Sequence, residues 1–373
     1  MTESLYIHIP FCVRKCIYCD FYSLPLSVPD TGTYVEALCA EMALRRGAAR
    51  NLRTVFIGGG TPTLLSATEA ARLLDTAAAL FSLRSDAEIT IEANPGTITM
   101  KKASDLRAAG VNRMSIGVQS LIDEELSLLG RAHSARDALA AMEAVRKAGF
   151  ENLSLDLMYG LPGQKMASWE YSLENSIGLT PEHFSTYELT PEEGTPLARL
   201  LEEGRLALPP EETVTDMYYR GIDLLAENGY MHYEISNFAK PGRSCAHNLT
   251  YWRREEYLGI GAAAHSFLHE KRTANFRDLR RYIDTVARGV LPVEEESGTS
   301  SIEAQKEMLF LGLRTSEGID MERSPLREPL EKSKTVEECI RLGLLEREGP
   351  RLRLGRRGLV LSSEILVKIL MEI

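Results

Sequence analysis

The sequence predicts an α/β protein built on a parallel β-sheet, followed by a small C-terminal α+β module. Three observations support this: six short β-rich runs alternate with helical runs, glycine and polar residues cluster after the strands, and composition changes before the last helices. Strands that alternate with helices of ~10–15 residues are typical of βαβ units. Six units are fewer than the eight of a closed barrel, so the sheet is either open and doubly wound or a partial barrel.

The elements of the first part follow one another in a regular order. The six strands are expected at residues 5–10, 54–59, 88–93, 114–119, 153–160 and 184–189. Helical periodicity is found at residues 34–47, 66–81, before 110, before 149, at 168–177 and at 213–228. The glycine at position 47 fits the left-handed residue that commonly ends a helix.

The end of the chain is expected to form a separate winged-helix-like module. The acidic stretch PVEEESGTSS, residues 292–301, indicates a linker. Helices are expected at 302–314, 336–345 and 359–371, with a basic hairpin at 351–358. Residues 301–373 carry equal numbers of acidic and basic side chains, so we expect a structural or partner-binding cap and no nucleic-acid partner.

Composition and charge indicate which class of protein this sequence encodes. Hydrophobic residues make up 44% and charged residues 26%, as in an ordinary globular protein. The formal charge of −10 is opposite in sign to the charge usual for proteins that bind the phosphate backbone of nucleic acids, so we expect no nucleic acid as the main partner. The N-terminus lacks the features of a signal peptide, and no apolar run is long enough to span a membrane. We therefore expect a cytoplasmic protein with reduced thiols.

Three of the six cysteines lie within eight residues. Cys12, Cys16 and Cys19 have the spacing C-x₃-C-x₂-C, and thiolates grouped in this way suit an iron–sulfur cluster or zinc. A structural zinc site needs a fourth ligand, which Cys245 with His247 could supply. A four-iron cluster held by three cysteines instead leaves one iron open for another ligand. Both interpretations remain open at this point.

The cysteine loop resembles the cluster motif of the radical S-adenosylmethionine (SAM) superfamily. The longer run YIHIPFCVRKCIYCDF, residues 6–21, resembles the branch that contains oxygen-independent coproporphyrinogen III dehydrogenases and the HemW group of haem chaperones. The resemblance extends from residue 5 to about residue 266. It implies a partial (β/α)6 TIM-like barrel, a [4Fe-4S] cluster, and SAM bound to the open iron. It also implies three parts: a barrel at 1–235, an extension at 236–295, and the C-terminal module at 296–373.

Further motifs occur in the order that this superfamily shows. IGGGTP follows the second strand, and its glycines allow a ligand to approach the backbone closely. An unpaired acid such as Asp156 within a buried strand is costly, which indicates a ligand or a fixed partner. The resemblance implies that nine residues contact SAM or lie beside it and the cluster: Tyr6, Tyr18, Gly59, Gly60, Thr61, Glu92, Gln119, Arg131 and Asp156.

Two features favour the chaperone group over the dehydrogenases. The dehydrogenases read C-x₃-C-x₂-C-x-C and carry an N-terminal extension, whereas here Cys19 is followed by Asp20 and Phe21, and we expect no such extension. The motif HNLTYW, residues 247–252, is the second feature, and its histidine is implicated in haem binding in the HemW group. Imidazole is a common axial ligand of haem iron. A histidine that hydrogen-bonds within its own loop is the alternative role for His247.

Three functions are consistent with the sequence. The favoured one is a haem chaperone that holds a cluster and SAM and passes haem to acceptor proteins such as respiratory enzymes, without dehydrogenase activity. The second is an oxygen-independent coproporphyrinogen III dehydrogenase, and the third is a structural zinc protein. A reductant protein, a peripheral membrane contact and a homodimer are further partners that the resemblance leaves open.

Overall fold

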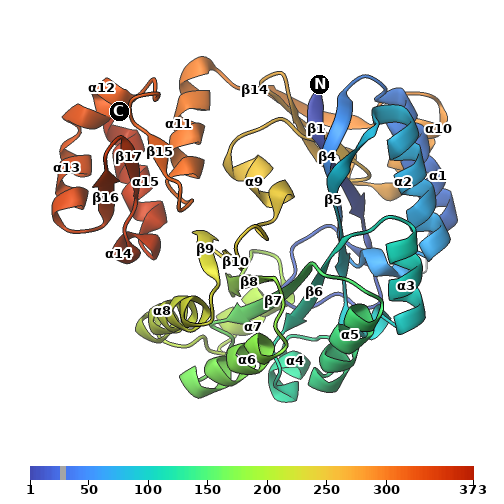
Figure 1. Ribbon diagram of the computed structural model, residues 1–373, viewed down its shortest axis with the longest axis horizontal. Coiled ribbons are helices and arrows are strands. Elements are labelled where there is room, and N and C mark those ends of the chain that lie inside the picture. The colour runs from blue at the N-terminus through green and yellow to red at the C-terminus, as the bar shows by residue number, and fades with distance from the viewer. Residues whose placement is uncertain (26–30) are drawn as a thin grey trace.

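A computed structural model describes residues 1–25 and 31–373, and its largest element is a nine-stranded sheet (Figure 1). Six neighbouring strands are parallel. In order they are β1 (Thr2–Ile9), β4 (Ala49–Gly59), β5 (Leu83–Ala93), β6 (Arg113–Gln119), β7 (Leu153–Tyr159) and β8 (His183–Glu188). Each overlaps a strand predicted from the sequence, which confirms the βαβ pattern.

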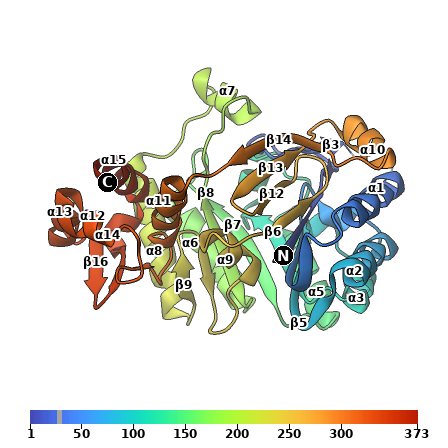
Figure 2. The ribbon, with the colours of Figure 1, turned by 90° about the horizontal axis from the view of Figure 1, so that it is seen from above.

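The strand order identifies the sheet as a partial barrel. A doubly wound sheet reverses its order at a switch point, whereas here the strands follow the chain from β1 to β8 without reversal. Helices cover the outer side of the curved sheet (Figures 1 and 2). They are α1 (Thr31–Leu44), α2 (Ala67–Phe81), α3 (Met100–Ala108), α5 (Ala135–Lys147), α6 (Met166–Gly178) and α8 (Glu211–Glu227). Among the described residues, no helix combines the length and apolar character needed to cross a bilayer.

Local sequence explains where these elements begin and end. The last residues of β5 and nearly all residues of β6 and β7 are buried, as expected for parallel strands covered on both faces. Ser66 and Ser134 begin α2 and α5 with capping boxes, in which serine and an acidic residue three positions later satisfy each other's backbone N–H. Gly110 and Gly149 follow α3 and α5 with φ of +107° and +86°, a conformation that glycine adopts without strain.

Shorter elements connect the barrel strands at the carboxyl ends. β2 (Phe11–Cys12) and β3 (Leu24–Pro25) pair with each other and flank the cysteine loop. The 3₁₀ turns η1 (Pro62–Leu64) and η2 (Pro95–Thr97) follow β4 and β5. The helices α4 (Asp123–Leu128) and α7 (Pro196–Glu202) follow β6 and β8. Their apolar residues form a small second core that supports Ile17 and Tyr18 of the cysteine loop.

Residues 236–295 extend the sheet at both edges. β10 (Asn237–Ala239) pairs antiparallel with β8 and β9 (Met231–Glu234), and β11 (Leu258–Ile260) pairs parallel with β1. Between them α9 (Ala246–Trp252) packs against β4, on the side of the sheet opposite α1 to α3 (Figure 1). The segment continues with β12 (His265–Leu268), β13 (Lys271–Asn275) and α10 (Leu279–Ala287). Helix α9 therefore fills part of the concave interior of the barrel.

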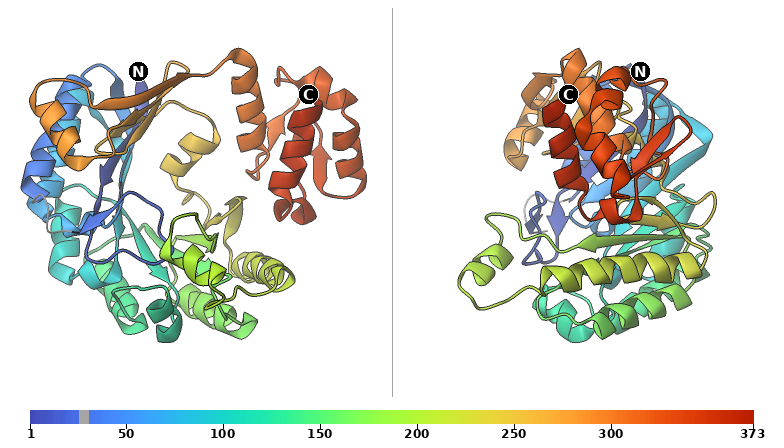
Figure 3. Two further views of the ribbon diagram at one scale, coloured as in Figure 1. Left: turned by 180° about the vertical axis from the view of Figure 1, so that it is seen from behind. Right: turned by 90° about the vertical axis from the view of Figure 1, so that its left-hand side faces the viewer.

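The C-terminal residues form an α+β module with its own apolar core (Figure 3). Its antiparallel sheet has the order β15 (Ile319–Asp320), β17 (Arg351–Leu354), β16 (Leu345–Glu348). Its helices are α11 (Ser301–Gly312), α12 (Arg327–Lys332), α13 (Lys334–Arg341), α14 (Arg356–Leu359) and α15 (Ser362–Glu372). These confirm the predicted module. The hairpin spans residues 345–354, however, so the second half of the stretch expected to be a hairpin is helical.

The stretch expected to be a linker is a strand. β14 (Val293–Gly298) pairs antiparallel with β13 and completes a three-stranded sheet with β12. Its residues are mostly exposed, which explains why its composition resembles that of a linker. The prediction of a linker at 292–301 is therefore wrong, because pairing with a distant strand overrides the local composition.

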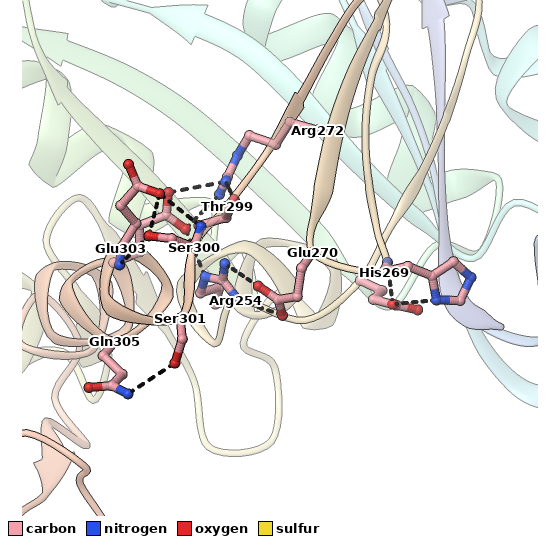
Figure 4. A network of polar contacts seen from close by, with 11 residues as sticks. Arg254, His269, Glu270, Arg272, Thr299, Ser300, Ser301, Glu303 and Gln305 are labelled. Carbon is pink, nitrogen blue, oxygen red and sulfur yellow. Dashed lines mark hydrogen bonds and ion pairs between the residues drawn. The ribbon is translucent and has the colours of Figure 1, made fainter.

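A network of charged side chains joins the barrel to the C-terminal module (Figure 4). Arg254, which follows α9, donates to the carboxylate of Glu270 at 3.0 and 2.7 Å and to Glu307 on α11 at 2.7 Å. Arg272 on β13 also donates to Glu307, at 3.1 Å. The Arg254 side chain is only 5% exposed, so this network is shielded from solvent on one side. It fixes the start of α11 against the barrel.

Candidate functional site

The carboxyl ends of the parallel strands form the mouth of the barrel, and most of the predicted site residues lie there. The cysteine loop follows β1, and Gly59 ends β4. Glu92 is the penultimate residue of β5, and Gln119 ends β6. Asp156 lies in β7, where it is in register with Gly117 of β6. This edge is where barrels of this kind place their active sites.

The three loop cysteines share one partly exposed neighbourhood. Burial raises the pKa of the Cys12 and Cys19 thiols, and the charge of the Cys16 thiolate adds to both shifts. Backbone bonds fix the loop, because Cys19 N–H donates to the Cys16 carbonyl at 3.3 Å and Ile17 N–H donates to the Leu129 carbonyl at 3.2 Å. Three thiols held together at the mouth match the predicted ligand set, and thiolates are the ligands that iron–sulfur clusters take.

Arg131 connects this loop to the end of β6. Its Nη1 donates to Cys16 Sγ at 3.4 Å, and its Nη2 donates to the Gly117 carbonyl at 2.7 Å. Its Nε is buried without a partner among the described residues. Tyr18 lies beside Arg131, and burial raises the pKa of its phenol. A guanidinium here opposes the negative charge that grouped thiolates create, and its free N–H is suited to a bound ligand.

The glycine run brings its backbone close to the cysteine loop. Gly60 N–H donates to the Ile9 carbonyl at 2.8 Å, and Thr61 N–H donates to the Phe11 carbonyl at 2.7 Å. A Cβ at position 60 would lie 2.6 Å from the Phe11 carbonyl oxygen and 3.0 Å from Cys12 Sγ. Glycine is therefore required for the two segments to meet. The Thr61 hydroxyl also donates to Cys12 Sγ at 3.7 Å.

Two carboxyl groups face the mouth from β5 and β7. Glu92 accepts the Gly59 N–H at 3.0 Å, and burial raises its pKa to about 7, with a contribution from the charge of Asp156. Asp156 accepts from the Ser115 hydroxyl at 3.0 Å. Burial also raises the pKa of Asp156. A bound cation would stabilise both carboxylates, and the ammonium and sulfonium groups of SAM carry positive charge.

Gln119 and Tyr6 complete the wall of the site. Gln119 has φ of +67°, which is unusual for a residue with a side chain and is found at functional sites. Tyr6 hydroxyl lies 3.0 Å from His8 Nδ1, while His8 Nε2 lies 3.1 Å from the Tyr22 carbonyl. A carbonyl only accepts, so His8 Nε2 donates and the Tyr6 hydroxyl donates to Nδ1. Burial lowers the pKa of His8 to about 4, which keeps this imidazole neutral.

The residues at the mouth fit the two groups that the sequence implies. The cysteines offer soft ligands, the glycine run leaves space that any Cβ would fill, and Arg131 has an unpartnered buried N–H. Cys12, Cys16 and Cys19 would hold the cluster. Gly59, Gly60 and Thr61, with the carboxylates of Glu92 and Asp156, would hold the amino-acid part and the charged groups of SAM.

His247 lies deeper in the barrel than these residues and is 1% exposed. Its Nδ1 is 2.8 Å from the Thr54 hydroxyl, and its Nε2 is 2.8 Å from the Tyr251 hydroxyl. Burial lowers the pKa of His247 to about 3, and its ring stacks on Phe56 at 5.1 Å between centroids. Both nitrogens are occupied, so His247 does not present a free ligand to haem iron in this conformation. Haem iron would have to displace one of these two hydroxyl groups to bind the imidazole.

The zinc interpretation lacks its fourth ligand at the loop. Cys245 Sγ lies 3.5 Å from Glu88 Oε1, and both nitrogens of His247 face Thr54 and Tyr251. Neither side chain is directed to Cys12, Cys16 or Cys19. Within residues 1–25 and 31–373, no three His, Cys, Asp or Glu side chains lie close enough to hold a single metal ion.

Comparisons with known proteins place this site in a family. Residues 6–175 match the radical SAM superfamily, and residues 299–361 match the HemN C-terminal domain. Heme chaperone HemW of Bacillus subtilis (strain 168) is 37% identical to this chain, and the alignment covers all of both proteins. The chain belongs to the HemW family. Heme chaperone HemW of Escherichia coli (strain K12) is 45% identical over 70% of this chain and 69% of its own.

A solved structure confirms the fold that HemW-family membership implies. Coproporphyrinogen III oxidase (HemN) from Escherichia coli, described as a radical SAM enzyme, superposes with a TM-score of 0.84 at 23% identity. The match covers 99% of this chain and 90% of that one. The predicted partial barrel with a small C-terminal module is therefore confirmed. Membership of the radical SAM superfamily implies a [4Fe-4S] cluster and SAM.

Several residues that shape the site of this HemW-family protein escaped the sequence predictions. Glu88 accepts the backbone N–H groups of Ala246 and His247 at 3.0 and 3.1 Å and so fixes the start of α9. Arg113 is 2% exposed, and the charges of Cys245, Glu88 and Asp156 raise its pKa against the opposing effect of burial. In the sequence, the sign of such a residue is a charged side chain at the beginning of an apolar strand. This pattern indicates that the charge is buried, but it does not identify the partner of that charge.

Proposed function

We propose that this HemW-family protein is a cytoplasmic haem chaperone. It would hold a [4Fe-4S] cluster and SAM, bind haem, and deliver haem to acceptor proteins such as respiratory enzymes. The observation that carries this proposal is the end-to-end alignment, at 37% identity, with a relative named as a heme chaperone. The cysteine loop, glycine run and paired carboxyl groups at one mouth support the cofactor part of the proposal.

The alternative is an oxygen-independent coproporphyrinogen III dehydrogenase. The structural match to the E. coli oxidase favours this alternative only at the level of the fold, because the identity is 23%. The dehydrogenase pattern has a further cysteine two residues after the third, and here that position is Phe21. Phe21 is 65% exposed beside the loop. A phenyl group can contact a flat apolar ligand but supplies no thiol.

Residues of this chain would hold both cofactors. The three thiolates would bind three irons and leave one open, and Arg131 would offset part of their charge. The backbone of Gly59–Thr61 supplies donors and acceptors to a zwitterionic amino acid. When bound and reduced, the cluster and SAM supply radical chemistry. Nothing in the proposed haem transfer requires turnover, so we expect no decarboxylation.

One preparation can test both functions. The full chain is purified without oxygen, and its cluster is reconstituted and confirmed by iron and sulfide content. One portion is titrated with haem and then mixed with an apo haem protein of a respiratory enzyme. Another receives coproporphyrinogen III, SAM and a reductant. We expect a haem Soret band that moves to the acceptor, and no release of carbon dioxide.

The outcomes separate the two proposals. Absence of haem binding by the reconstituted protein would overturn the chaperone function. Release of carbon dioxide in step with loss of coproporphyrinogen III would establish the dehydrogenase instead. A Cys16→Ala variant serves as the control for the second assay, since any activity that depends on the cluster must disappear in it.

A further inference from the structure

Asp156, one of the two carboxyl groups at the mouth of the barrel, is surrounded by serine hydroxyl groups from three neighbouring strands. Ser115 of β6 donates to Asp156 Oδ1 at 3.0 Å, and Ser154 of β7 donates to the same oxygen at 3.4 Å. Ser185 of β8 is in register with Asp156 and also bonds to its side chain. Hydrogen bonds from hydroxyl groups stabilise the charged carboxylate, which is the form that binds a cationic ligand such as SAM.

Ser154 is itself held by a buried histidine. His183 begins β8 and is completely buried, and its Nδ1 lies 2.8 Å from the Ser154 hydroxyl. Its Nε2 lies 2.7 Å from the hydroxyl of Tyr233 on β9. Burial and the charge of Arg113 lower the pKa of His183 well below its usual value, so the ring is neutral and carries one proton. The side chains from Asp156 to Tyr233 therefore form one continuous chain of hydrogen bonds.

The donors and acceptors of this chain have one consistent direction. The Tyr233 hydroxyl accepts the Cys245 N–H at 3.3 Å, and among the described residues His183 Nε2 is the only acceptor for its own proton. Tyr233 therefore donates to Nε2, which places the histidine proton on Nδ1. Nδ1–H then donates to Ser154, and the Ser154 proton is directed at Asp156. With the other tautomer, Ser154 would have to donate to Nδ1, and Asp156 would lose one of its donors.

The far end of the chain lies where the barrel meets the C-terminal module. The Tyr233 carbonyl accepts the Ser316 N–H at 3.0 Å, and the next residue, Glu234, forms a β-bridge with Thr315. Tyr233 and Trp252 also line a cavity of ≈450 Å³ between α9 and the module. A change in the way that the module is attached to β9 would therefore move the first donor of the chain.

We propose that His183 is a positioning residue for SAM: through Ser154 it directs a hydroxyl proton at Asp156, and through Tyr233 it makes this arrangement depend on the attachment of the C-terminal module. The inference rests on the SAM site of the proposed function, in which Asp156 contacts SAM. Tyr233 is separated from Asp156 by the side chains of His183 and Ser154. It therefore acts on SAM binding only through the chain.

The test measures SAM binding to the full-length reconstituted protein by anaerobic equilibrium dialysis, without a reductant so that SAM is not cleaved. Tyr233→Phe removes only the hydroxyl group at the far end of the chain, and we expect SAM affinity to weaken about threefold to tenfold. Tyr230→Phe is the matched control, because the Tyr230 hydroxyl is also buried but donates to the Pro181 carbonyl, outside the chain. We expect wild-type affinity in this control.

Substitutions at His183 separate the effect of its hydrogen bonds from that of its bulk. His183→Leu removes both nitrogens, and we expect SAM affinity to weaken about tenfold or more. His183→Asn keeps an N–H close to the position of Nδ1 and should retain affinity within about threefold of wild type. Ser154→Ala should weaken affinity about tenfold. Adding Tyr233→Phe to Ser154→Ala should cause no further loss, because the chain is already interrupted.

The tautomer of His183 is a second, independent measurement. Nuclear magnetic resonance of the full chain, labelled with ¹⁵N-histidine and free of the paramagnetic cluster, distinguishes the two ring nitrogens. The signals of His183 are those that are missing in His183→Asn. We expect a protonated Nδ1 and an unprotonated Nε2. The opposite tautomer would overturn the direction of the chain and with it the inference.

The outcomes separate this inference from the function on which it rests. Absence of SAM binding by the reconstituted wild type would overturn the SAM site of the proposed function. If wild type binds SAM, unchanged affinity in Tyr233→Phe and Ser154→Ala would overturn only the role of the chain. An equal loss of affinity in Tyr230→Phe, or equal losses in His183→Leu and His183→Asn, would show that packing rather than the chain governs SAM binding.

Discussion

At the scale of single residues, the cysteine loop depends on contacts with distant parts of the chain. Arg131 lies 115 residues from Cys16, yet its guanidinium reaches the Cys16 sulfur. Thr61 reaches Cys12 from 49 residues away. Three ligands on a flexible loop are thus held in place by the neighbouring strand ends. Such pre-organisation lowers the cost of assembling a metal centre.

Replacing one loop cysteine should remove the cluster without unfolding the chain. We expect Cys16→Ala to lose iron and sulfide after anaerobic reconstitution, because two thiolates cannot hold a four-iron cluster. Cys39→Ala is the control, since Cys39 lies on α1 and, among the described residues, its sulfur accepts only from the Thr76 hydroxyl. Iron and sulfide analysis measures both variants. Retention of a full cluster by Cys16→Ala would show that this loop is not its ligand set.

His247 should contribute to the stability of the folded chain. His247→Ala removes a buried ring and leaves the Thr54 and Tyr251 hydroxyls without this partner. We expect the free energy of unfolding to fall by about 2–4 kcal/mol. Urea unfolding at pH 7.5 measures this, and His269→Ala should change it by less than about 0.5 kcal/mol. An unchanged stability in His247→Ala would mean that α9 is not packed as described.

At the scale of elements, the meeting of the glycine run with the cysteine loop is sensitive to a single methyl group. A Cβ at position 60 has no space beside the Phe11 carbonyl and Cys12 Sγ. We expect Gly60→Ala to lower stability by about 1–3 kcal/mol and to reduce iron content. Gly178→Ala is the control, because a Cβ there meets nothing within 4 Å. Equal iron content in the two variants would contradict the close approach.

The barrel strands were predictable because buried strands have an apolar local sequence that can be recognised without the structure. Parallel strands covered on both faces are rich in apolar residues, as the predicted strands at 5–10, 54–59 and 153–160 are. β14 has the sequence VEEESG, and its residues are nearly all exposed. It is a strand because Lys271 of β13 pairs with Glu296 at 2.6 Å and the two strands form a ladder. Cross-strand charge pairing of this kind is invisible to local composition.

The residues of the candidate site also fall into a group that could be predicted from the sequence and a group that could not. Cysteines, glycines and acids at strand ends were predictable because their chemistry is carried by short motifs. The environment of His247 was not, because its Nδ1 partner Thr54 lies 193 residues away. Arg277 likewise meets the Tyr22 ring only through the fold. Spacing along the chain identifies ligands, whereas burial and partners depend on long-range packing.

At the scale of the whole molecule, the C-terminal module is attached through charged contacts and through backbone hydrogen bonds between residues 233–235 and 314–316. Arg254 holds Glu270 and Glu307, and Arg356 of α14 binds Asp223 of α8 through two hydrogen bonds at 2.7 and 2.8 Å. Arg254 is the most buried of these charges. A buried guanidinium contributes more than an exposed one, because its carboxylate partners lose their compensation when it is removed.

Removal of Arg254 should therefore weaken the attachment of the module. We expect Arg254→Gln to lower the free energy of unfolding by about 1–3 kcal/mol. The neighbouring Arg253→Gln breaks an exposed pair with Glu317 and should cost less than about 0.5 kcal/mol. Fluorescence of Trp252, which lines the cavity between α9 and α11, reports the change during urea unfolding. Equal effects of the two substitutions would show that burial does not matter at this junction.

Buried histidines should make the whole molecule sensitive to acid. Burial lowers the pKa of five of the seven histidines, to about 4 for His8, His133 and His232, to about 3 for His247, and well below its usual value for His183. Buried carboxyl groups act in the opposite direction, because burial raises the pKa of Glu92 and Glu234 to about 7 and also raises the pKa of Glu41 and Asp156. Between pH 6.5 and 5, the unfolded chain gains protons on five imidazoles. The folded chain gains protons mainly on these carboxyl groups, which are fewer than the five imidazoles.

The unfolded state therefore binds more protons in this range, and stability must fall as the pH falls. We expect the free energy of unfolding of the cofactor-free protein to decrease by about 2 kcal/mol per pH unit between pH 6.5 and 5. Urea unfolding at pH 7.5, 6.5 and 5.5 measures the slope. Glu92→Gln should steepen it, since the folded state then loses one proton-binding group that opposes the histidines. A stability that is constant or rises on acidification would mean that the imidazoles reach solvent and titrate normally.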